Sequence, residues 1–208
     1  MTLDASMLRR LATERLHAAP PVEAARGDRD LNPETAEEMS GGGRKVLAAV
    51  LVPIVERPGG LTVLLTQRNA DMPSHPGQVA FPGGKLDPGD DGPLSAALRE
   101  AEEEIGLARK YVEPLGYLDT YQTGTGYRIS PVVALIADGF ALNLNSQEVA
   151  VAFEVPLAFL LDPVNHKLQS REWRGKLRHY YTMPYGEHFI WGATAGMIRN
   201  LHDRLMPP

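Results

Sequence analysis

The sequence predicts an α/β or α+β sandwich, in which helices cover a β-sheet. Three observations support this fold class. Strand-like segments lie on both sides of one amphipathic helical segment at residues 93–105. A second helical pattern, over residues 191–205, closes the chain. The chain has 208 residues and contains no internal repeat, so one main domain with a sizeable core is expected.

The N-terminal part divides into a helix and a linker. Residues 3–17 place leucines between charged residues, which predicts a short amphipathic helix. Residues 18–43 contain AAPP, GDRD, NPE and SGGG, which are typical of an extended linker. The glycine run is not a phosphate-binding loop, because no glycine-lysine-serine pattern follows it. We therefore predict an N-terminal arm at 1–43 and a main domain at 44–208.

The strands of the main domain are predicted in pairs. The turn sequence ERPGG lies between two predicted strands, KVLAAVLVPIV and LTVLLTQR. The turn sequence QTGTG lies between another predicted pair, GYLDTY and YRISPVVALIA. EVAVAFEVPL is a further strand, followed by a short helix or turn at LAFLLD. KLQSREW and KLRHYYTM read as two polar and aromatic strands around Arg174 and Gly175.

The central helix has clear start and stop signals. Asp91 or Gly92 can cap it, Pro93 suits its first turn, and Gly106 suits the left-handed position at its end. At about 100° per residue, its apolar side chains form one narrow stripe that must face the core. These residues are Leu94, Leu98, Ala101 and Ile105.

Three acids of this helix, Glu100, Glu103 and Glu104, fall on the side opposite the stripe, whereas Glu102 points elsewhere. A solvated charged face is one interpretation. A divalent-cation site is the other, because the acids crowd the negative end of the helix dipole with only Arg99 as a local positive partner. Carboxylate oxygens suit Mg²⁺ or Mn²⁺. The helix by itself leaves both interpretations open.

The composition limits the other classes of function. The absence of cysteine excludes disulfides, thiolate metal sites and cysteine nucleophiles. A net charge of −5 argues against general nucleic-acid binding. The apolar runs are too short to span a bilayer, and the N-terminus does not read as a secretory signal. We expect a cytoplasmic protein without membrane or nucleic-acid partners.

The segment FPGGKLDPGDDGP precedes the acidic helix, and its glycines allow a backbone carbonyl to turn toward a cation. Together with LREAEEEIGL it closely resembles the signature of the Nudix hydrolases. The stretch from Arg99 to Leu107 matches the second half of that signature at every position. The first half departs from it: an aspartate, Asp90 or Asp91, stands where the family has the glutamate that orients the arginine.

The resemblance implies a Nudix-type α/β/α sandwich, with a mixed central sheet and the Nudix loop and helix. It also implies hydrolysis of a nucleoside diphosphate derivative with Mg²⁺ or Mn²⁺. Glu100, Glu103, Glu104 and the Gly84 carbonyl are the implied metal ligands. The catalytic candidates are Glu100, Glu103 and Glu148, with Arg99 as a residue that orients a glutamate. Glu148 can equally be an ordinary acid at a strand edge.

A second block, LLTQRNADMPSHPGQVAFPGG, resembles the motif of coenzyme A pyrophosphatases. It implies cleavage of coenzyme A or its derivatives to 3′,5′-ADP and 4′-phosphopantetheine, with Arg68, Lys85 and Phe81 as substrate contacts. Pro73 stands where the motif has a second arginine, which leaves NADH, ADP-ribose or a related compound as alternative substrates. A catalytically silent nucleotide-binding module is a further alternative. A small-molecule partner is expected in each case, and a homodimer is possible.

Overall fold

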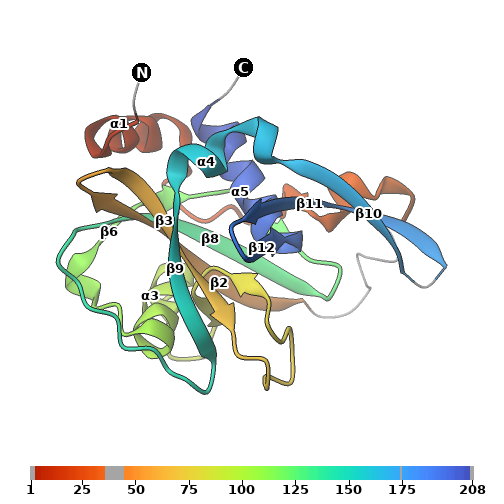
Figure 1. Cartoon of the computed structure of the whole chain (residues 1–208), viewed down its shortest axis with the longest axis horizontal. Coiled ribbons are helices and arrows are strands. Elements are labelled where there is room, and N and C mark those ends of the chain that lie inside the picture. The colour runs from red at the N-terminus through yellow and green to blue at the C-terminus, as the bar shows by residue number, and fades with distance from the viewer. Residues whose placement is uncertain (1–2, 36–44, 174, 207–208) are drawn as a thin grey trace.

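The computed structural model describes residues 3–35, 45–173 and 175–206 (Figure 1). Within these ranges a nine-stranded sheet and a three-stranded sheet lie with helices on their faces. The strands of the large sheet are β1 (Arg26–Gly27), β2 (Val46–Arg57), β3 (Gly60–Arg68), β4 (Val79–Ala80), β5 (Gly83–Lys85), β6 (Val112–Tyr117), β7 (Tyr121–Gln122), β8 (Tyr127–Ile136) and β9 (Val149–Pro156). The small sheet contains β10 (Lys167–Trp173), β11 (Lys176–Tyr185) and β12 (His188–Trp191).

The helices are α1 (Ala5–Arg15), α3 (Pro93–Ile105), α4 (Leu157–Leu161) and α5 (Gly192–Leu205). Short 3₁₀ turns, η1 (Asp28–Leu31), η2 (Pro33–Thr35), η3 (Arg109–Tyr111) and η4 (Pro163–Asn165), join several of these elements. No helix in the described ranges has the length and apolar character needed to cross a membrane.

Strand β2 is the centre of the large sheet. It pairs in parallel with β8 and antiparallel with β3 and β5, so the sheet is mixed. Residues 48–55 of β2 are buried on both faces, which explains why this strand reads as a continuous apolar run and not as an alternating one. One end of β2 pairs with β5, with Ala49 opposite Gly84, and this pairing brings the glycine loop to the sheet.

The two faces of the large sheet have separate cores. Helix α3 packs on one face, where Leu51, Leu64 and Ile105 are buried together. Helices α1, α4 and α5 cover the other face, and their side chains share a second core with Val52 and Val63. Figure 1 shows the sheet between these helices. The prediction of an α/β/α sandwich with a mixed central sheet is therefore confirmed.

The N-terminal segment differs from the expected extended linker over its described part. Strand β1 pairs in parallel with β7, and the hydroxyl of Tyr121 donates a 2.7 Å hydrogen bond to Asp28. Asn32 is buried, and its side chain bonds the backbone of His179 in β11. The segment packs because its polar side chains satisfy these groups, an arrangement that local turn signals do not reveal. Residues 36–43 lie outside the described ranges, so the boundary at 43 and 44 stays a prediction.

Candidate active site

Helix α3 begins and ends where the sequence predicts. Gly92 precedes it, Pro93 is its first residue, and Gly106 ends it with φ 69°, in the left-handed region that glycine tolerates. Ala96, Ala97, Ala101 and Ile105 form its buried face, while Leu94 and Leu98 pack at the rim of the core. The small alanines allow the helix to lie close to the sheet, near β5.

The three predicted acids differ in depth. Glu104 is only 4% exposed, and its Oε2 accepts a 3.1 Å hydrogen bond from the backbone N–H of Gly83. The side chain of Glu100 is 16% exposed, and that of Glu103 is 58% exposed. The projection placed Glu104 opposite the apolar stripe, but the structure buries it because the glycine loop packs over that side of the helix. Glu102 points away from this group, as predicted, and it lies 3.4 Å from Arg109, a partner that the sequence did not indicate.

Arg99 joins two of the acids to the loop before the helix. Its Nη1 lies 3.0 Å from both Glu100 Oε1 and Glu103 Oε2. Its Nε and Nη2 donate to the two carboxylate oxygens of Asp90, at 3.2 and 3.0 Å. The carbonyl of Lys85 accepts a further bond from Nη2. The structure therefore identifies Asp90, between the two aspartates that the sequence left open, as the residue that fixes Arg99.

Burial and neighbouring charges perturb the pKa of the inner acids. The pKa of Glu104 is raised to about 7, mainly by burial and further by the charges of Glu100 and Glu148. The hydrogen bond from Gly83 and the positive charge of Arg68 act in the opposite direction. Burial also raises the pKa of Glu100, and Glu103 and Glu148 add to this, although Arg99 opposes it. The site thus concentrates negative charge that its own cations do not fully balance.

The donor set at this site fits a divalent cation. A Cβ added at Gly84 would lie 2.4 Å from Glu100 Oε1, so only a glycine leaves room for this carboxylate against the loop backbone. The donors that the structure places here are carboxylate oxygens, which Mg²⁺ and Mn²⁺ prefer. In the described part of the chain the acids do not form a compact group of three, because Glu103 turns outward to Arg99 and Glu104 turns inward to Gly83.

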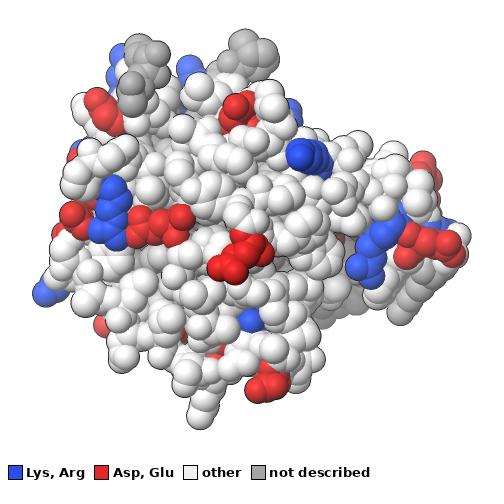
Figure 2. All heavy atoms as spheres, in the orientation of Figure 1, with Lys and Arg blue, Asp and Glu red and all other residues white. Residues whose placement is uncertain are grey.

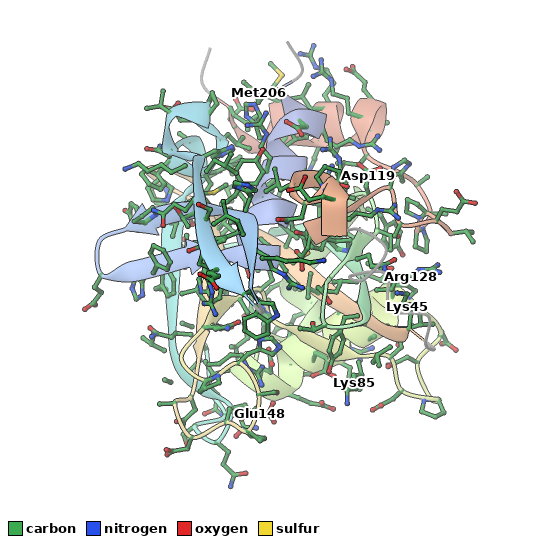
Figure 3. All side chains as sticks on the ribbon, turned by 90° about the vertical axis from the view of Figure 1, so that its right-hand side faces the viewer. Lys45, Lys85, Asp119, Arg128, Glu148 and Met206 are labelled. Carbon is green, nitrogen blue, oxygen red and sulfur yellow. The ribbon has the colours of Figure 1, made fainter. Side chains whose placement is uncertain are left out.

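Three other predicted residues lie at the same end of the sheet. Glu148 precedes β9, accepts a 3.2 Å bond from Asn145, and is close enough to raise the pKa of Glu104. Arg68, at the end of β3, lowers the pKa of the same carboxyl. Lys85 ends β5 with an exposed side chain. Figure 3 shows Lys85 and Glu148 in the lower part of the molecule, whereas Asp119 and Met206 lie in the upper half.

Two further residues of the second block lie in contrasting surroundings. Phe81 is 3% exposed and packs in the core on the face opposite α3, so its ring offers almost no surface to a ligand in this structure. Pro73 is exposed on the loop between β3 and β4. The charges of Arg68 and Glu148 thus influence the carboxyl of Glu104, whereas Phe81 lies in the other core.

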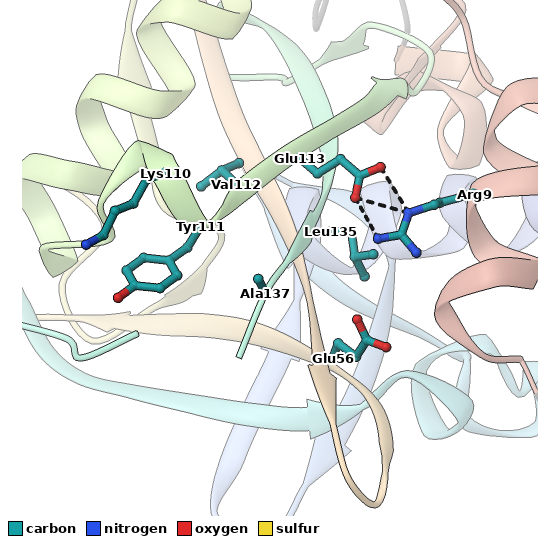
Figure 4. Close-up of a pocket in the computed structure, with 8 residues that line it drawn as sticks. All are labelled: Arg9, Glu56, Lys110, Tyr111, Val112, Glu113, Leu135 and Ala137. Atoms are coloured by element: carbon teal, nitrogen blue, oxygen red, sulfur yellow. Dashed lines mark hydrogen bonds and ion pairs between the residues drawn. The ribbon is translucent and has the colours of Figure 1, made fainter. Parts of the chain in front are cut away.

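The other surfaces give less indication of a ligand site than the acidic helix does. On the face shown in Figure 2, acidic and basic side chains are interspersed and do not form one broad patch of a single sign. A small pocket lies between α1 and β6, where Arg9 and Glu113 form an ion pair of 2.7 Å (Figure 4). Its lining contains none of the predicted site residues.

Comparison with known proteins identifies similar chains. A family model described as NUDIX domain matches residues 45–175. A protein of Photorhabdus laumondii named "Uncharacterized Nudix hydrolase NudL" is 42% identical over 158 residues, which are 76% of this chain and 84% of that protein. The protein of the same name from Escherichia coli K12 is 43% identical over 155 residues, covering 74% and 80% of the two chains. The crystal structure of the Nudix hydrolase RenU from M. smegmatis aligns with a TM-score of 0.49 and 27% identity, over 58% of this chain and 76% of that one.

Proposed function

The chain belongs to the Nudix family and is a pyrophosphohydrolase, and we propose that it cleaves the pyrophosphate of coenzyme A or its derivatives with Mg²⁺ or Mn²⁺. The products are 3′,5′-ADP and 4′-phosphopantetheine, or its acylated form. The observation that carries this proposal is the second block of sequence, LLTQR to FPGG. In the fold this block runs from β3 to β5, so it delivers Arg68 and Gly84 to the acidic helix.

Glu100, Glu103, Glu104 and the carbonyl of Gly84 would hold the cation. When bound, a divalent cation neutralises phosphoryl oxygens and lowers the pKa of a water. For this ligand set to form, Glu103 must leave Arg99, which the exposure of its side chain allows. Arg99 keeps Asp90 and Glu100 as partners and therefore stays in place to position the loop against the helix. We therefore propose that Arg99 is a positioning residue, which its bonds to Asp90 and Glu100 support.

The reaction adds water to one phosphorus and breaks the bond from that phosphorus to the bridging oxygen. The attacking water must lose a proton, and Glu100, Glu103 or Glu148 is the proposed acceptor. Arg68 and Lys85 are the proposed phosphate contacts. The positive charge of Arg68 acts on Glu104, and Lys85 is an exposed cation whose backbone carbonyl bonds Arg99. Their charge attracts a polyanionic substrate to a site whose own acids would otherwise repel it.

The substrate is tested by comparing kcat/KM for coenzyme A, an acyl-coenzyme A, NADH and ADP-ribose, with Mg²⁺, with Mn²⁺ and with EDTA. We expect coenzyme A or its acyl form to lead the panel. If both ranked tenfold or more below another substrate, which is about 1.4 kcal/mol of transition-state preference, the substrate assignment would be wrong. Pro73 favours that second outcome, with NADH or ADP-ribose as substrate. The coenzyme A motif has an arginine at this position, and proline offers no positive charge to the 3′-phosphate of coenzyme A.

The acidic site is tested by a matched pair of variants. Glu103→Gln removes a proposed metal ligand, whereas Glu102→Gln changes a neighbouring acid of similar exposure that pairs with Arg109. We expect the first variant to lose turnover with an unchanged fold and the second to keep it. Full hydrolysis by the Glu103→Gln enzyme would contradict the metal assignment. A silent nucleotide-binding module would show no metal-dependent turnover with any substrate of the panel.

A further inference from the structure

Among the residues that the structure describes, the small sheet has an open edge. Strands β10 and β11 form a hairpin that projects at the right of the molecule in Figure 1. Strand β10 is the outermost strand of this sheet, and all seven of its residues are exposed. Both of its faces carry large apolar side chains, with Leu168 57% exposed and Trp173 41% exposed. An exposed strand of this length, with no strand beside it in the described ranges, is a template for pairing with another strand.

The hydrogen bonds of the neighbouring strand show which backbone groups of β10 point outward. In β11, the N–H and C=O of His179 both bond Asn32, on the side away from β10. Ser170 lies opposite His179, so this pair exchanges no ladder bonds and the backbone groups of Ser170 also point away from β11. The alternation of an antiparallel ladder then turns the N–H and C=O of Leu168 and Glu172 outward as well.

We propose that a second copy of this chain pairs with this edge, β10 against β10 in antiparallel orientation, with the two-fold axis at Ser170. In this register Ser170 faces Ser170, and Leu168 faces Glu172. The outward groups of these residues then bond each other across the axis, two bonds for each facing pair. The side chains also agree: Lys167 faces the indole of Trp173, and Gln169 faces Arg171, in both halves of the symmetric interface.

The charged side chains of β10 favour this register and a second copy of the chain as the partner. A shift by two residues in one direction places Arg171 opposite Arg171, and a shift in the other direction places Lys167 opposite Arg171. Like charges directly opposite each other are unfavourable across strands. In the centred register no like charges face each other, so two copies of β10 can pair without this penalty. An unrelated strand has no reason to match this order of charges, which is why the second copy is the proposed occupant.

The cross-link test uses the absence of cysteine from the chain. Residue 170 of one copy faces residue 170 of the other, at a Cα separation of about 5.5 Å for a hydrogen-bonded antiparallel pair. This distance lies in the range that a disulfide spans, about 4.4–6.8 Å. We expect Ser170→Cys to form a disulfide-linked dimer under mild oxidation at least tenfold faster than Glu187→Cys, an exposed control in the turn between β11 and β12. Equal rates for the two variants would overturn the proposal.

The mass test uses sedimentation equilibrium of the unlabelled full chain over a wide range of concentration. We expect a dimer that Ser170→Pro converts to a monomer. Proline removes an N–H that makes no bond within the hairpin, so the variant should keep its far-ultraviolet circular dichroism and its pyrophosphatase activity. A monomeric wild-type chain at every concentration would overturn the proposal. So would a wild-type dimer that Ser170→Pro leaves intact, because the contact would then use another surface.

Discussion

Replacement of Gly84 by alanine should lower kcat strongly without unfolding the protein. Gly84 lies in β5 opposite Ala49, and the carboxylate of Glu100 occupies the space that a Cβ at Gly84 would take. An added Cβ would meet this carboxylate at 2.4 Å from Oε1, 2.5 Å from Cδ and 2.7 Å from Oε2. All three atoms belong to the end of one side chain, so the clash can be relieved by moving Glu100 alone.

The size of this movement gives the expected loss. Real Cβ atoms essentially never approach another heavy atom within 3.0 Å, so the carboxylate of Glu100 must move by more than half an ångström. Misplacement of a reacting group by about 1 Å can cost about 100-fold in rate. We therefore expect kcat to fall by about 100-fold, which is roughly 2.7 kcal/mol of transition-state stabilisation. The free energy of unfolding should change little, because no backbone atom is displaced.

Two neighbouring glycines are the controls for this measurement of kcat and Tm. A Cβ at Gly89 has no atom within 4 Å, so Gly89→Ala should match the wild type in both quantities. A Cβ at Gly83 would lie 2.4 Å from the backbone oxygen of Ala49, so Gly83→Ala should lower Tm by several degrees. Wild-type kcat in Gly84→Ala would refute the reasoning. A drop in Tm as large as that of Gly83→Ala would assign the lost activity to unfolding instead.

Three further predictions concern the arginine, a buried ion network and the metal. Asp90→Asn should lower kcat/KM roughly tenfold because it loosens Arg99, whereas Asp91→Asn should match the wild type in the same assay. Burial alone would raise the pKa of Asp119, but hydrogen bonds from Arg204 and the other partners of this carboxylate lower the pKa overall. The ionised Asp119 therefore stabilises the fold above about pH 4, and this stability is lost as the pH falls further. Asp119→Asn should thus cost about 3 kcal/mol in urea denaturation at pH 7 and about 1 kcal/mol less at pH 3; an equal cost at both values would contradict this sign. Mg²⁺ or Mn²⁺ at about 100 times its Kd should raise Tm by roughly 5–10 °C in a thermal melt, and EDTA should reverse the shift; no shift with either ion would argue against the site.

Local signals were sufficient for the ends of the central helix and for the β10–β11 hairpin. Gly92, Pro93 and Gly106 fix both ends of α3, because capping and the left-handed conformation depend on only a few neighbouring residues. The pairing of β10 with β11 around residues 174 and 175 follows in the same way from their polar and aromatic pattern. The packing of residues 26–32 could not be predicted, because it depends on Tyr121 and His179, which lie far away in the sequence.

The sequence by itself determined the fold class, the family resemblance and the acidic helix, since periodicity, turn residues and motif spacing are properties of short segments. Only the tertiary structure decided that Glu104 is buried, that Asp90 and not Asp91 holds Arg99, and that Phe81 lies in the core. Burial and partner choice depend on which strand or loop packs over a side chain. The glycine loop covers Glu104 because β5 pairs with β2, a contact between segments more than thirty residues apart.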